Sequence, residues 1–145
     1  MNLTTLLKYP LVAFVGGLGL LSSLVVLAQP GALFAALTVN PGENQIVLNL
    51  EIAACERQQM RGLQGRTSLA EDAGMLFLID PVDKVSLWMK DTYIPLDILF
   101  VDAEYRIVGL VESAAPLSLR SIDSPRDVAA VIEVKAGFVQ RSGVS

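Results

Sequence analysis

Apolar and polar residues alternate along much of the chain after residue 45, and this pattern predicts a domain built mainly from strands. Between residues 45 and 52 every second side chain is apolar, which is typical of a strand with one buried face. Short apolar stretches separated by turn-forming residues predict further strands at residues 74–79, 85–89, 94–101, 106–111 and 128–134. We therefore expect a mainly β (α+β) fold: a small, largely antiparallel sheet, curled or barrel-like, with one short helix near residues 55–64.

The N-terminal region has a different pattern, because residues 11–28 contain no charged side chain. A run of this length forms roughly 27 Å of α-helix, close to the thickness of a membrane's hydrocarbon core. Two interpretations stay open for residues 1–28: a cleaved signal peptide or an uncleaved N-terminal membrane anchor. Either would place the domain outside the cytoplasm, periplasmic or extracellular, exported across or anchored in the cytoplasmic membrane. We expect a linker over residues 29–44 and a single β-rich domain over residues 45–145.

Charge and composition exclude several classes of function. The chain has 11 basic and 15 acidic side chains with interleaved signs, and its net charge is −4. Nucleic acid is therefore not an expected partner, because phosphate binding requires clustered Lys or Arg. One Cys cannot form an internal disulfide, and the absence of His removes the commonest metal ligand and general base. Met60, Met75 and Met89 offer thioethers that suit Cu(I), but this set is incomplete without His, so we expect no metal site and no cofactor.

The segment 74–101 is the most informative part of the chain. Two apolar stretches flank a polar centre that holds Trp88, the only Trp, together with Lys90 and Thr92. Alternation places Trp88 and Lys90 on one face and Met89 on the other. Two interpretations of Trp88 stay open: its indole stacks on a sugar or another small polar ring, or it packs in the core while Lys90 pairs with an acid.

Asp97 is an acid between two apolar residues of a predicted strand, where burial of a charge is expensive. If Leu96, Ile98 and Phe100 face the core, Asp97 points outward or into a cleft. It is then either an exposed or lightly bonded acid that accepts backbone N–H groups at a turn, or a ligand-binding or general acid/base carboxylate at a pocket wall.

Several multi-residue strings resemble one known family. They are Gly62-Leu63 followed by Arg66, Gly74 to Phe77, Trp88 to Lys90 followed by Thr92, and Pro95 to Asp97 followed by Phe100. In this order they resemble the domain-of-unknown-function 192 family, and Pro116, Ser124, Glu133 and Gly137 fit its later pattern. The resemblance implies a small β-rich domain, often exported or membrane-anchored. It implies no catalytic residue and no cofactor.

The chain departs from the family pattern at three places. Gln64 stands where Met is usual, and Asp91 where Asn is usual. The sequence also stops at Ser145, where relatives usually continue into a last strand. The missing strand would leave a sheet edge unpaired, which is either a liability for aggregation or an opening for a partner strand.

These observations favour a non-enzymatic domain of the cell envelope that binds a small polar ligand or has a structural role. The candidate ligand-binding residues are Arg66, Trp88, Lys90, Thr92 and Asp97. One alternative is a hydrolase of envelope glycans that uses Asp97 and a second acid. The candidates for that second acid are Asp91, Glu112 and Glu133. Another alternative is an interaction module that offers an unpaired sheet edge to an envelope protein.

Overall fold

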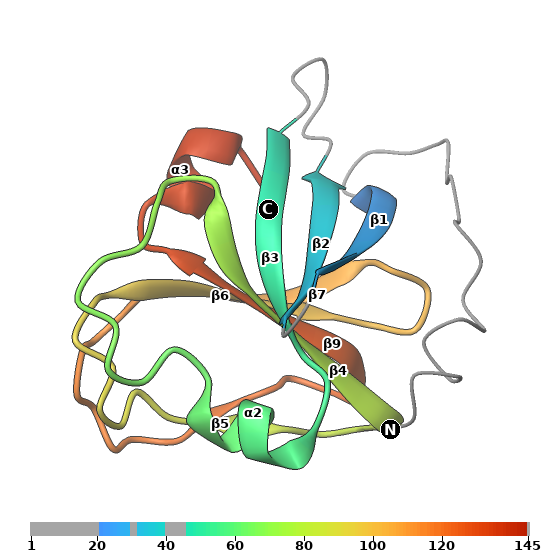
Figure 1. Ribbon diagram of the computed structural model, residues 1–145. Coiled ribbons are helices and arrows are strands. Elements are labelled where there is room, and N and C mark those ends of the chain that lie inside the picture. Colours follow the sequence, from blue (N-terminus) through green and yellow to red (C-terminus); the bar gives the residue numbers. More distant parts are fainter. Residues whose placement is uncertain (1–20, 30–31, 40–45, 145) are drawn as a thin grey trace.

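Seven strands form one curled sheet in the order β1-β2-β3-β4-β9-β6-β7, as the computed structural model shows (Figure 1). The structure describes residues 21–29, 32–39 and 46–144. The strands of this sheet are β1 (Leu21–Gln29), β2 (Ala32–Val39), β3 (Ile46–Ala53), β4 (Ala73–Asp83), β6 (Leu96–Val101), β7 (Ile107–Ala114) and β9 (Val128–Lys135).

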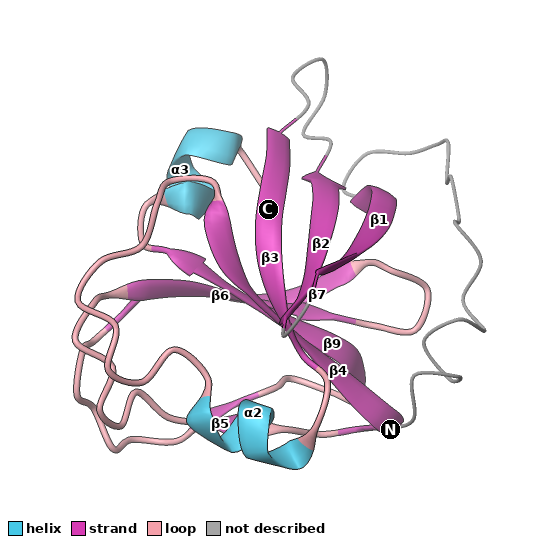
Figure 2. Cartoon of the chain, in the orientation of Figure 1, coloured by secondary structure: helices cyan, strands magenta, loops and turns pink. Residues whose placement is uncertain are grey.

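Two short strands and two short helices complete the described part of the chain (Figure 2). They are β5 (Ser86–Leu87), β8 (Ile122–Asp123), α2 (Glu56–Arg61) and α3 (Phe138–Ser142). Strands β5 and β8 pair with each other as a separate two-stranded sheet. Within the large sheet every pair is antiparallel except β3 and β4, which are parallel. A parallel pair needs a long crossover, and the segment containing α2 provides it.

One face of the large sheet is covered by α3, and we call it the helix-covered face. Alternate residues of β3, β4, β6 and β9 form an apolar cluster there, closed by two side chains of α3. Its members include Leu48, Leu50, Ile52, Leu76, Leu99, Val101, Ile132 and Val134 of the strands, with Phe138 and Val139 of α3.

The opposite face is covered by loops, and we call it the loop-covered face (Figure 2). The strands contribute Met75, Phe77, Leu96, Ile98, Phe100 and Val131, and the loops contribute Leu63, Leu69 and Met89. Strand β6 lies between the two clusters, so all six of its residues are buried. This double burial explains why its sequence, LDILFV, is apolar at five of six positions.

The expected mainly β fold is confirmed, and the helix predicted near residues 55–64 is α2. The sheet is curled but open, with β1 and β7 at its edges among the described strands. Helix α3 and strand β8 were not predicted. Both are too short to produce a readable period, and β8 falls within a segment rich in turn-forming residues.

The N-terminal region contains two strands where a helical leader and a linker were expected. Part of the apolar run over residues 11–28 forms β1, and residues 32–39 of the predicted linker form β2, which pairs with β3. Residues 1–20 lie outside the described residues. In the part of the chain that the structure describes, no helix is long and apolar enough to span a membrane.

Candidate functional site

Asp97 is fully buried, on the helix-covered face of β6. Its Oδ1 accepts a hydrogen bond from the backbone N–H of Ser113 (2.8 Å), and its Oδ2 accepts one from Val139 (2.9 Å). The expectation that Asp97 points outward or into a cleft is therefore wrong. The pattern of β6 correctly put Leu96 and Ile98 on the opposite face, but α3 covers the face that was expected to be open. Asp97 joins β6, β7 and the first turn of α3, and both carboxylate oxygens are engaged.

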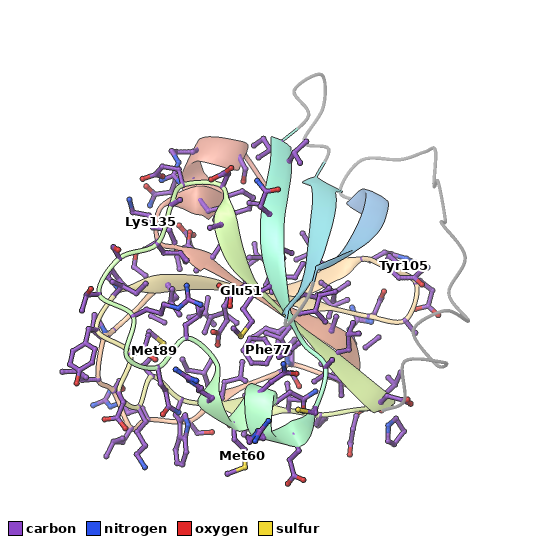
Figure 3. All side chains as sticks on the ribbon, in the orientation of Figure 1. Glu51, Met60, Phe77, Met89, Tyr105 and Lys135 are labelled. Atoms are coloured by element: carbon purple, nitrogen blue, oxygen red, sulfur yellow. The ribbon has the colours of Figure 1, made fainter. Side chains whose placement is uncertain are left out.

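Trp88 and Lys90 project from the surface, whereas Met89 between them is buried. The exposed fractions of Trp88 and Met89 are 55% and 1%. The ammonium nitrogen of Lys90 lies 5.6 Å from the centroid of the Trp88 ring, within the range of a cation–π interaction. The predicted division of these three residues between two faces agrees with this geometry. The interpretation that Trp88 packs in the core does not, because the core side chain of this segment is Met89 (Figure 3).

Thr92 is buried and organises a turn. Its N–H donates to the carbonyl of Met89 (3.1 Å), and its hydroxyl lies 3.3 Å from the carbonyl oxygen of Lys90. Its own carbonyl accepts the N–H of Leu117 (3.0 Å). Thr92 thus stabilises the turn of residues 88–93, which we call the Trp88 segment, and joins this segment to a second loop.

That second loop, residues 115–119, was not predicted to be part of the site. It is joined to the Trp88 segment by the bond from Leu117 and by another from the N–H of Met89 to the carbonyl of Ser118 (2.9 Å). Large side chains are exposed on both segments: Tyr93 (55%), Leu117 (52%) and Leu119 (70%). We call Trp88, Lys90, Tyr93, Leu117 and Leu119 together the loop surface. In the sequence, the pattern Leu117-Ser118-Leu119 within a polar loop was the signal that could have indicated an exposed apolar surface there.

Both segments of the loop surface contain backbone strain. Asp91 has φ 53° and Leu117 has φ 60°, a left-handed conformation that residues other than Gly rarely adopt. Such strain persists only where the surrounding structure imposes it, and it often occurs at functional sites. The hydrogen bonds of Thr92 and Met89 to the second loop impose it here.

Arg66 lies in the loop after α2, on the loop-covered side of the sheet, where the Trp88 segment also lies. Its guanidinium contacts Glu51 Oε1 of β3 at 2.5 Å, and both side chains are partly exposed. The N–H of Gly65 donates to the carbonyl of Asp91 (2.8 Å), so the Arg66 loop adjoins the Trp88 segment. The structure thus brings the Arg66 loop near the segment holding Trp88, Lys90 and Thr92, and leaves Asp97 on the other side of the sheet.

Glu133 lies on the loop-covered face of β9. In the sheet register it stands between Met75 of β4 and Ile98 of β6. It is 6% exposed, and its carboxyl forms no hydrogen bond or ion pair with another described residue. Burial raises the pKa of its carboxyl to about 7. Glu133 and Asp97 lie on opposite faces, so they cannot flank one substrate.

Fold and site together define a small β domain with exposed aromatic and leucine side chains on two joined loops and a carboxylate buried inside the sheet. The chain belongs to the DUF192 family (Uncharacterized ACR), whose model matches residues 37–145. This confirms the resemblance found in the sequence.

Two solved structures are similar to this chain. A protein of Sinorhizobium meliloti 1021, provisionally named a transcription regulator, is 42% identical over 70% of this chain and 79% of that one, with a TM-score of 0.69. A protein of unknown function from Novosphingobium aromaticivorans is 29% identical over 90% of this chain and 94% of that one, with a TM-score of 0.76. A comparison with curated proteins found no match.

Proposed function

We propose that the protein is a non-enzymatic binding domain of the cell envelope whose loop surface binds carbohydrate. The observation that carries this proposal is the exposure of the only Trp of the chain beside Lys90. An aromatic ring offers a flat π face to the C–H groups of a sugar, and a neighbouring ammonium can donate hydrogen bonds to hydroxyl groups. The envelope location rests on the apolar pattern of residues 11–28.

The construction of the loop surface supports the proposal. Two backbone hydrogen bonds join the segments that carry it, and Met89 anchors one of them in the core. A surface that is already ordered loses little conformational freedom on binding. Exposed Tyr93 supplies a second aromatic ring on the same segment.

The buried state of Asp97 argues against the alternative of a glycan hydrolase that uses this residue. Such an enzyme needs two carboxyl groups across an open cleft. Both oxygens of Asp97 are bound to backbone N–H groups beneath α3, where no substrate reaches them. Nucleic acid binding, which the name of the Sinorhizobium protein would suggest, finds no support in the net charge of −4.

A protein partner is the second candidate, and the exposed leucines favour it. Leu117 and Leu119 add apolar area to the loop surface that a sugar would use less well than an apolar protein surface. The two candidates predict different responses in the same experiment.

Trp88 itself is the probe for this test. Because it is the only Trp, its fluorescence reports on the loop surface alone. The full-length protein is titrated with soluble peptidoglycan fragments and with a neutral glucan. We expect a saturable shift of the emission with one of them, weakened at least tenfold by Lys90→Ala or Tyr93→Ala.

Met60→Ala is the matched control, because Met60 is 70% exposed on α2 and projects away from the sheet (Figure 3). This variant should bind as the wild type does. Calorimetry replaces fluorescence for Trp88→Ala, which should abolish binding. A titration with no saturable change for either glycan would exclude carbohydrate binding by these classes and leave the protein partner.

A further inference from the structure

We propose that Glu133 is a proton-binding site that controls how firmly the loops beneath the loop surface pack on the sheet. In its neutral form Glu133 stays buried and the loops remain closed. Its ionised form draws water to the loop-covered face and loosens them. This inference goes beyond the proposed function, and only its consequence for ligand affinity rests on that function.

The position of Glu133 is the first step. Its side chain is on the loop-covered face, between Met75 and Ile98. Both of these neighbours belong to the apolar cluster that the loops complete with Leu63 and Met89. An ionised carboxylate without a partner is unstable in such surroundings, and it regains solvation only where the cover opens.

Charged groups near this position do not compensate Glu133. Lys135, two residues along β9, forms an ion pair with Glu71 at 2.5 Å. Arg66 forms an ion pair with Glu51. Glu51 stands two strands away from Glu133, on the other side of Met75 in the sheet register. Strands β4 and β6 present only apolar side chains beside it, and Lys90 and Asp91 of the Trp88 segment are exposed. Burial is accordingly the cause of its raised pKa.

The connection to the loop surface runs through the cover itself. Met89 is buried in the loop-covered cluster, and its neighbours Trp88 and Lys90 are on the surface. Leu63 is buried in the same cluster and anchors the loop in which the N–H of Gly65 donates to the carbonyl of Asp91. When the cover loosens, both hydrogen-bonded segments of the loop surface lose their anchor.

Hydrogen exchange of the full-length protein between pH 5 and 8 tests this inference without a ligand. The reporters are the N–H groups of Gly65, Met89 and Leu117, which make the inter-loop hydrogen bonds. Glu133→Gln keeps the shape of the neutral side chain, and Glu133→Leu is a second variant that cannot ionise, in this case with an apolar side chain. We expect the ratio of wild-type to variant exchange rates at these N–H groups to rise by about tenfold per pH unit between pH 5 and 7.

Two results would overturn the inference. One is an unchanged ratio. The other is a free energy of opening at these N–H groups that equals that of core amides such as those of Leu99 and Ile132 at every pH, which would mean that the loops open only when the whole protein unfolds. Glu112→Gln, at an exposed glutamate of β7, is the matched control and should leave the exchange rates unaltered. Where the exchange result holds and no glycan binds, the proposed function fails while the proton-binding site stands.

Discussion

At the scale of single residues, Asp97 illustrates how one buried carboxylate organises a small domain. Its two oxygens accept N–H groups that are 16 and 42 residues away in the chain. One of these groups belongs to the first turn of α3, where a negative charge is favourable. The other belongs to Ser113, whose φ of 51° is strained and needs such support.

Asp97→Asn should therefore lower the free energy of unfolding by about 2 kcal/mol. The amide keeps one acceptor oxygen, but its NH₂ group faces an N–H that then has no partner. Urea unfolding followed by circular dichroism measures the loss. Asp127→Asn, at an exposed position without a hydrogen bond among the described residues, should stay within about 0.5 kcal/mol of wild type.

Trp88 and Met89 are adjacent but differ in burial, so their substitutions should differ in effect. Trp88→Ala removes an exposed ring and should cost less than about 1 kcal/mol of unfolding free energy. Met89→Ala leaves a cavity in the loop-covered cluster and should cost about 2–5 kcal/mol. Thermal unfolding of the two variants provides the comparison. Equal losses would contradict the exposed position of Trp88.

At the scale of elements, the contact between β4 and β9 depends on Gly74. A Cβ atom at this position would lie 2.3 Å from the carbonyl oxygen of Glu133 and 2.8 Å from Cδ2 of Leu50. The backbone oxygen cannot move without separating two central strands of the sheet. The glycine is therefore required by close approach and not by its dihedral angles.

Gly74→Ala should reduce the free energy of unfolding by about 1–3 kcal/mol, through overpacking at this strand pair. Gly65→Ala is an informative comparison, because its φ is 78° but nothing lies within 4 Å of a Cβ there. That variant reports the cost of backbone conformation alone. If Gly74→Ala proved as stable as wild type, the strands would have to be farther apart than described.

The elements also show what the sequence could and could not predict. Strands such as β3 and β9 were predictable because their apolar residues recur or run together over eight positions. Periodicity could not tell that α3 covers the second face of β6, so Asp97 was expected at a surface or cleft. Periodicity also could not tell whether Trp88 or Met89 is in the core, because both are large apolar side chains and they lie on opposite faces of the alternating pattern. Those answers depend on segments distant in the chain.

At the scale of the whole molecule, Glu133 gives stability a pH dependence of unusual sign. The unfolded glutamate ionises near pH 4.5, whereas in the folded protein the pKa is about 7. Between these values the folded state binds more protons, so this group makes stability fall as pH rises. Glu71 and Asp123 act in the opposite sense, because side-chain hydrogen bonds, chiefly from Lys135 and Ser121 respectively, lower their pKa values.

The contribution of Glu133 is isolated by the difference between Glu133→Gln and wild type. The variant should gain about 3 kcal/mol relative to wild type between pH 4.5 and pH 8. Urea unfolding at four pH values across this range measures the difference. A difference that does not change with pH would show that Glu133 is solvated in the folded state.

The place of β9 in the sheet has a consequence for biosynthesis. β9 follows the other six strands of the sheet along the chain, yet it lies between β4 and β6 and joins the two halves. A nascent chain that has not yet emerged from the ribosome beyond residue 127 therefore leaves both neighbouring strands without their common partner. Completion of the sheet therefore waits until β9 has emerged. If the protein is exported, as we propose, this delay would keep the chain unfolded for longer before it crosses the membrane.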